Sequence, residues 1–107
     1  MNIVAVTSCP TGVAHTYIAA QALEKAFKAS GHSIKVETQG AIGIGNKLTS
    51  DEISNADFII LTNDVTIEFK NRFEGMEIVK VSVSDIIRKT NLLVKKLDQI
   101  YNVRNKK

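Results

Sequence analysis

The chain has 107 residues, 44% hydrophobic and 23% charged, with a net charge of +3, one cysteine and one proline. These values describe a globular domain with one core, and a single cysteine excludes an internal disulfide. No apolar run in the sequence is long enough to cross a bilayer. Much of the basic excess lies in the last helix and its tail without interleaved aromatic or glycine residues, which argues against nucleic-acid binding. We therefore expect one cytoplasmic domain over residues 1–107, ending in a flexible basic tail.

Short apolar runs and amphipathic segments alternate in the first half of the chain. Residues 2–7 are apolar and β-branched, as is typical of a strand buried on both faces of a parallel sheet. A helix starts near Gly12, and Gly31 ends it as a left-handed cap before a second strand at 33–38. The helical period predicts that one side of this helix faces the sheet, with His15, Ile18, Ala19, Ala22, Leu23, Ala26 and Phe27.

The same alternation continues after the glycine-rich segment QGAIGIGN. Residues 49–52 (TSDE) predict a capping box for a short helix that ends near Ala56, and a third strand covers residues 57–62. Residues 65–73 fit neither period, which indicates a loop or a turn of helix.

The last strand and helix complete the pattern. A fourth strand covers about residues 77–81, and Ser82 with Asp85 indicates the start of a helix over Ser84 to about Asn102. One face of this helix is predicted to carry Ile86, Ile87, Leu93, Val94, Leu97, Ile100 and Tyr101.

These elements predict an α/β fold with a four-stranded parallel sheet in the order 2-1-3-4. Helices cover both faces, as in three-layer Rossmann-like or flavodoxin-like domains. In such sheets ligands bind at the carboxyl edge where the strand order reverses, here between the first and third strands. Cys9 lies at that point, and we expect Glu37, Gln39, Gly40 and Asp64 along the same edge.

Cys9 occupies the turn between the first strand and the first helix. An unassisted thiol, with a pKa of about 8.5, is mostly protonated at neutral pH, so the turn has to stabilise a reactive thiolate. The free backbone N–H groups of residues 11–16 could do this, and they could also hold a phosphate. Gly12 permits close approach, and His15 could donate to the phosphate or only hydrogen-bond the loop.

Several chemistries use a cysteine in such a turn. The spacing from Cys9 to His15 copies the Cys-x5-Arg loop of phosphatases, but histidine cannot clamp two phosphate oxygens as arginine does. Redox exchange needs a second thiol, which the chain lacks. A flavin mononucleotide holder is disfavoured because the chain has no tryptophan and two tyrosines. A phosphoryl relay fits best, with a cysteine-dependent phosphatase or a phosphorylation sensor as alternatives.

Three segments of the sequence resemble a known protein family. The sequences CPTGVAHTYIAAQAL at 9–23, KVETQGAIGIGNKLT at 35–49 and DEISNADFIILTNDV at 51–65 closely resemble the fructose-family enzyme IIB component of the bacterial phosphoenolpyruvate-dependent sugar phosphotransferase system. The likeness continues through RFEG at 72–75 and weakens in the last helix. It implies that Cys9 accepts a phosphoryl group from a phosphohistidine of the IIA component and passes it to a sugar held by the membrane component IIC.

The resemblance also implies roles for the residues around Cys9. The phosphate loop comprises Pro10, Thr11, Gly12, Val13, Ala14, His15 and Thr16, and an adjacent loop carries Glu37, Gln39 and Gly40. From the residues alone, Glu37 to Gln39 indicate a solvated turn. The resemblance implies no metal or cofactor, partners IIA and IIC, and a free-standing subunit that meets the inner face of the membrane through IIC. It leaves open the hexose carried and the oligomeric state.

Overall fold

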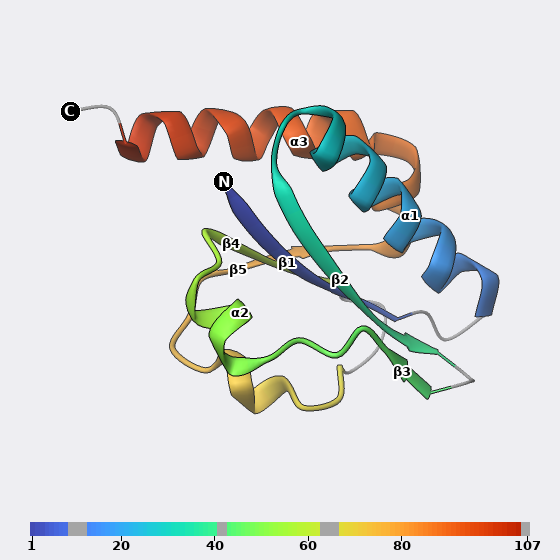
Figure 1. Ribbon diagram of the computed structural model, residues 1–107. Helices are drawn as coiled ribbons and strands as arrows, with labels where there is room; N and C mark the ends of the chain where they lie inside the picture. The colour runs from blue at the N-terminus through green and yellow to red at the C-terminus, as the bar shows by residue number, and fades with distance from the viewer. Residues whose placement is uncertain (9–12, 41–42, 63–66, 106–107) are drawn as a thin grey trace.

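The computed structural model describes residues 1–8, 13–40, 43–62 and 67–105 (Figure 1). Its strands are β1 (Asn2–Thr7), β2 (Ser33–Gly40), β3 (Gly43–Gly45), β4 (Phe58–Thr62) and β5 (Ile78–Val81). Its helices are α1 (Val13–Ala29), α2 (Ser50–Ser54), the short 3-10 helix η1 (Lys70–Phe73) and α3 (Val83–Asn105).

The strands form one five-stranded sheet in the order β3-β2-β1-β4-β5. The four strands expected from the sequence are parallel and lie in the predicted order, but the prediction of a purely parallel four-stranded sheet is wrong. β3 adds an antiparallel edge, with Gly45 opposite Thr38 and Gly43 opposite Gly40. A Cβ at Gly45 would lie 2.7 Å from Thr38 Oγ1, so this close pairing requires glycine.

The sheet lies between two layers of helices, which confirms the three-layer α/β arrangement. In Figure 1, α1 and α3 lie above the sheet while α2 and η1 lie below it. Alternate residues of the central strand enter the two cores: Ile3 and Ala5 face α1 and α3, whereas Val4 and Val6 face the side of α2 and η1. This two-sided burial explains why β1 is almost continuously apolar.

Helix α1 is rotated relative to the predicted face. Its buried residues are Thr16, Ala19, Ala20, Leu23 and Phe27. The predicted inward positions of His15 and Ile18 are wrong: His15 is exposed and Ile18 is 45% exposed. The compact side chains of Thr16, Ala19 and Ala20 let the first half of this face pack closely against the sheet.

The ends of α1 and α2 follow the predicted chemistry. Gly31 has a φ of 83°, with His32 N–H donating to Phe27 C=O and Gly31 N–H to Lys28 C=O, each at 3.0 Å. This confirms the left-handed cap. The capping box of Thr49 and Glu52 is also present, but α2 ends at Ser54 rather than near Ala56.

Helix α3 begins as predicted, but it is kinked and longer than predicted. Ser82 Oγ accepts from Asp85 N–H at 3.0 Å, as expected of a helix start. The helix is kinked at Lys89, beside Thr90, whose hydroxyl donates to the Ile86 carbonyl; such bonds bend helices.

The buried face of α3 and its length differ in part from the prediction. Val94 and Leu97 lie in the core, but Ile87 is 36% exposed, so its predicted inward position is wrong. The helix continues to Asn105, beyond the predicted end at Asn102. Among the described residues, no helix has the length and apolar character needed to span a membrane.

Candidate functional site

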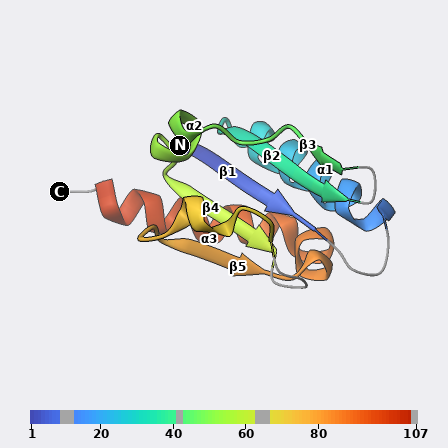
Figure 2. The same ribbon diagram turned by 90° about the horizontal axis from the view of Figure 1, so that it is seen from below.

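The carboxyl ends of β1, β2 and β4 meet at one edge of the sheet (Figure 2). Cys9, Pro10, Thr11, Gly12 and Asp64 lie outside the described residues, and the side chain of Val13 is likewise not described. The geometry of the candidate site is therefore given by the described side chains at this edge of the sheet and in the first turn of α1.

Ser8, the residue before Cys9, is held from both neighbouring strands. Its N–H donates to Thr62 Oγ1 at 3.0 Å, and the same hydroxyl donates to the Ser8 carbonyl at 3.2 Å. The Ser8 hydroxyl donates to the Gln39 carbonyl at 3.1 Å. Ser8 is 8% exposed and Thr62 is 3% exposed, so water competes little for these groups. The end of β1 is thus fixed immediately before the cysteine.

The first turn of α1 is tied to the same strand. Thr7 Oγ1 donates to the Thr16 carbonyl at 3.1 Å. The Thr16 hydroxyl is buried and has no hydrogen-bond partner among the described residues. Leaving a buried hydroxyl unpaired costs about 1–3 kcal/mol, a cost that a bound oxyanion would remove. Ala14 and His15 lie exposed in this first turn.

Glu37 lies in a buried polar network rather than in a solvated turn, so that interpretation is wrong. Its carboxylate is inaccessible to solvent and pairs bidentately with Arg72, with N–O distances of 2.8 and 2.6 Å. It also accepts from Leu48 N–H and from the Gln39 amide, each at 2.8 Å. Burial alone would raise the pKa of Glu37, but the hydrogen bonds from Arg72, Gln39 and Leu48 outweigh it and hold the pKa below its ordinary value of 4.5.

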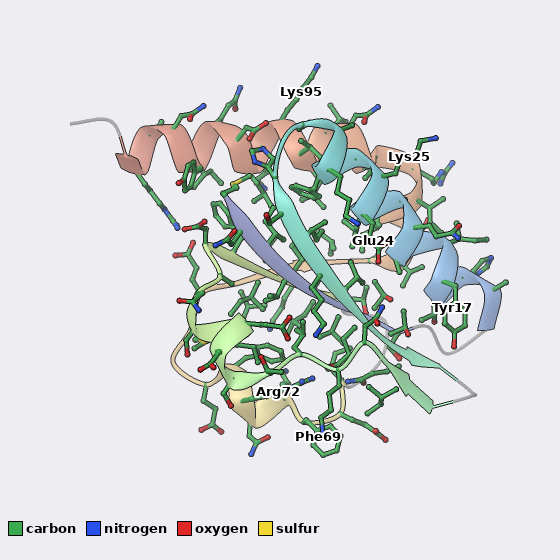
Figure 3. The ribbon with its side chains drawn as sticks, in the orientation of Figure 1. Tyr17, Glu24, Lys25, Phe69, Arg72 and Lys95 are labelled. Carbon is green, nitrogen blue, oxygen red and sulfur yellow. The ribbon has the colours of Figure 1, made fainter. Side chains whose placement is uncertain are left out.

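Gln39 joins this network to the segment before η1. Its amide nitrogen donates to the Glu68 carbonyl at 3.0 Å, and its amide oxygen accepts from Glu68 N–H at 2.8 Å. Arg72 Nε donates to the carbonyl of Phe69, a half-exposed residue with a φ of 59° (Figure 3). The network therefore stabilises two loops beside the sheet edge through Glu37 and Gln39 together.

Gly40 allows a close contact between the end of β2 and α1. A Cβ on Gly40 would lie 3.0 Å from the Tyr17 hydroxyl oxygen, so the tyrosine packs directly over the end of β2 (Figure 3). The structure thus brings Thr16, Glu37, Gln39 and Gly40 to one edge, as expected. Arg72 was missed as a site residue because nothing in the sequence indicates that it pairs with Glu37, 35 positions away.

Substitution of Glu37 is expected to change the response of stability to acid. Its lowered pKa means that the unfolded chain binds more protons, so its stabilising contribution is complete above about pH 4.5 and is lost as the pH falls through the folded-state value. We expect Glu37→Gln to lower the free energy of unfolding at neutral pH and to make its decline below about pH 5 shallower. Urea denaturation at a series of pH values measures both effects.

Glu52 provides the matched control for this experiment. Its pKa is also lowered, by hydrogen bonds from Lys35 and the Thr49 N–H, but its side chain is about one-third exposed. Glu52→Gln should therefore change the acid response less than Glu37→Gln. An unchanged acid slope in Glu37→Gln would contradict the prediction.

Comparisons with known proteins agree with one another on the kind of protein to which the chain is similar. A family model described as "PTS system, Lactose/Cellobiose specific IIB subunit" matches residues 4–96. The chain is 51% identical over 97 residues to the PTS system fructose-like EIIB component 2 of Escherichia coli K12, covering 91% of this chain and 92% of that protein.

Two further relatives extend the comparison to a fused protein and to a solved structure. The PTS system fructose-specific EIIB'BC component of Vibrio cholerae is 48% identical over 89 residues, covering 83% of this chain and 15% of that protein. The solution structure of the Enzyme IIB subunit of a PTS system from Escherichia coli K12 has a TM-score of 0.91 at 37% identity, covering 98% and 97% of the two chains.

Proposed function

Because the chain belongs to the IIB family of the sugar phosphotransferase system, whose members are phosphotransferases, we propose that Cys9 is its phosphoryl carrier. The thiolate sulfur attacks the phosphorus of a phosphohistidine on IIA, so that an S–P bond forms as the P–N bond breaks. A sugar hydroxyl held by IIC then attacks the same phosphorus and gives up its proton to a base of that component or to water, so that an O–P bond forms, the S–P bond breaks and the thiolate is restored. No metal is needed in either step.

The observation that carries this proposal is the unpartnered Thr16 hydroxyl. It is buried in the first turn of α1, directly after the segment that contains Cys9. The N–H groups at a helix start are also free of helical partners, and together with this hydroxyl they favour a bound phosphoryl oxygen. In the proposed site, Pro10 to Thr16 form the phosphate loop, and Glu37, Gln39 and Gly40 support its neighbours.

A relay is favoured over a phosphatase by the residue at the sixth position after Cys9. A phosphatase of the Cys-x5-Arg type has an arginine there to clamp two phosphate oxygens, whereas this chain has His15, which lies exposed. We expect the phosphoryl group to remain on sulfur until IIC presents a hydroxyl. Sustained phosphate release from an aryl phosphate would instead support the phosphatase.

We assign the partners and the substrate from the names of similar proteins. IIB components work with IIA and IIC components, and the name of the Vibrio cholerae relative shows a B and a C component within one protein. That relative is named fructose-specific and the Escherichia coli relative fructose-like, which supports a fructose-type sugar for this chain. In this proposal, the chain works in the cytoplasm and meets the membrane by docking on IIC.

Peptide mass spectrometry after incubation with phosphorylated IIA tests the function. We expect a phosphoryl group on the peptide that contains Cys9, and none on that peptide when IIA is not phosphorylated. A donor that remains active toward a known IIB component but leaves Cys9 unmodified would reject the proposal.

A further inference from the structure

We propose that Thr62 is a positioning residue for Cys9, an inference that rests on the proposed function of this cysteine. Thr62 is the last residue of β4, and its hydroxyl engages both the N–H and the C=O of Ser8. It makes no contact with substrate in this proposal. Its role is to determine the direction in which the chain leaves β1 toward the nucleophile.

The Thr62 hydroxyl takes the place of backbone hydrogen bonds at the point where the pairing between β1 and β4 stops. The register between these strands ends at Val6 opposite Leu61, while Ser8 lies beyond the last residue of β1. Without the Thr62 hydroxyl, the N–H of Ser8 would be buried without the partner it has here, and its C=O would lose one. The Thr62 side chain thus supplies the two hydrogen bonds, to the N–H and the C=O of Ser8, that a longer β4 strand would have supplied from its backbone.

Fixing the Ser8 carbonyl constrains the backbone at Cys9. This carbonyl belongs to the planar peptide group that joins Ser8 to Cys9, so a hydrogen bond to its oxygen limits rotation of the whole group. The Ser8 hydroxyl adds a second restraint from the side of β2 through the Gln39 carbonyl. Ser8 is therefore held between two strands on either side of β1.

Such restraint matters because phosphoryl transfer depends on the alignment of the attacking and leaving atoms. A misplacement of about 1 Å can lower a rate by about 100-fold. A hydroxyl can both accept from an N–H and donate to a C=O, so serine could replace Thr62 but valine, which has nearly the same shape, could not. This difference separates hydrogen bonding from packing.

The test compares Thr62→Val, Thr62→Ser and wild-type protein in single-turnover transfer from phosphorylated IIA. We expect Thr62→Val to lower the maximal rate of Cys9 phosphorylation by about 10–100-fold with little change in the IIA concentration needed for half-saturation. Thr62→Ser should restore the rate to within about threefold of wild type. Thr38→Val, a matched change of a buried threonine in β2, the strand on the other side of β1, should stay within the same range.

The controls separate this inference from the proposed function. If wild-type protein accepts phosphate on Cys9 and folded Thr62→Val does so at the same rate, Thr62 is not a positioning residue although the function holds. If the wild type accepts no phosphate on Cys9, the function itself fails. Should Thr62→Val not fold, Thr62→Ala removes the same hydroxyl with a smaller side chain, and a wild-type rate in that folded variant would overturn the proposal.

Discussion

Replacing Cys9 with serine is expected to lower phosphoryl transfer from IIA by about 10⁴-fold or more, the effect of removing a nucleophile from an enzyme. A serine hydroxyl is a weak nucleophile without an adjacent general base, whereas a thiol, with a pKa of about 8.5, loses its proton far more readily. Rapid-quench measurement of phosphate incorporation compares the two proteins directly. Uptake of the sugar by cells that carry only the Cys9→Ser protein should fall in parallel.

A matched control distinguishes loss of the nucleophile from a general effect of substitution. Ser54→Ala changes an exposed residue of α2, far along the chain from the site, and should transfer phosphate at the wild-type rate. Thermal unfolding of Cys9→Ser should resemble that of wild type. Transfer by Cys9→Ser at a rate near wild type would assign the phosphoryl group to another residue.

Arg72→Ala is expected to have the largest effect on stability, about 3–5 kcal/mol. Arg72 is the charge partner of Glu37, whose side chain is 0% exposed, so its removal leaves a buried carboxylate with only the hydrogen bonds from Leu48 and Gln39. For a domain of this size, the loss corresponds to a fall in Tm of roughly 12–25 °C. Calorimetry or thermal denaturation followed by circular dichroism measures it.

Two variants show whether burial of the pair causes this loss. Arg72→Lys keeps the charge but cannot make the bidentate contact, so its stability should lie between those of wild type and Arg72→Ala. Arg104→Ala breaks an ion pair with Glu77 in which both side chains are largely exposed, and it should cost less than about 1 kcal/mol. Equal losses in Arg72→Ala and Arg104→Ala would contradict the account.

The four parallel strands and their order could be predicted because short apolar, β-branched runs mark the strands and right-handed crossovers restrict the topology. β3 could not, since Gly43–Gly45 is short and contains two glycines, and its pairing depends on the close approach of Gly45 to Thr38. The rotation of α1 was missed because the helical period of the sequence fits two neighbouring faces. Only packing against the sheet selects the face that buries Thr16 and Ala20.

The position of the candidate site followed from topology and the placement of Cys9 between a strand and a helix. Its supporting contacts did not, because they join residues far apart in sequence. The hydrogen bonds between Ser8 and Thr62 span 54 positions, and neither residue stands out by type. A solvated turn was predicted at Glu37 because the sequence does not show that Glu37 pairs with Arg72. Long-range polar pairing of this kind leaves no periodic signal in a sequence.

Phosphorus NMR of the phosphorylated protein is the most direct measurement of the central claim, that a sulfur at position 9 carries the phosphoryl group between IIA and the sugar. We expect a thiophosphate resonance that persists in buffer and disappears as sugar phosphate forms when membranes containing IIC and fructose are added. A resonance from phosphohistidine at His15, or release of inorganic phosphate at the same rate with and without IIC and fructose, would contradict the claim.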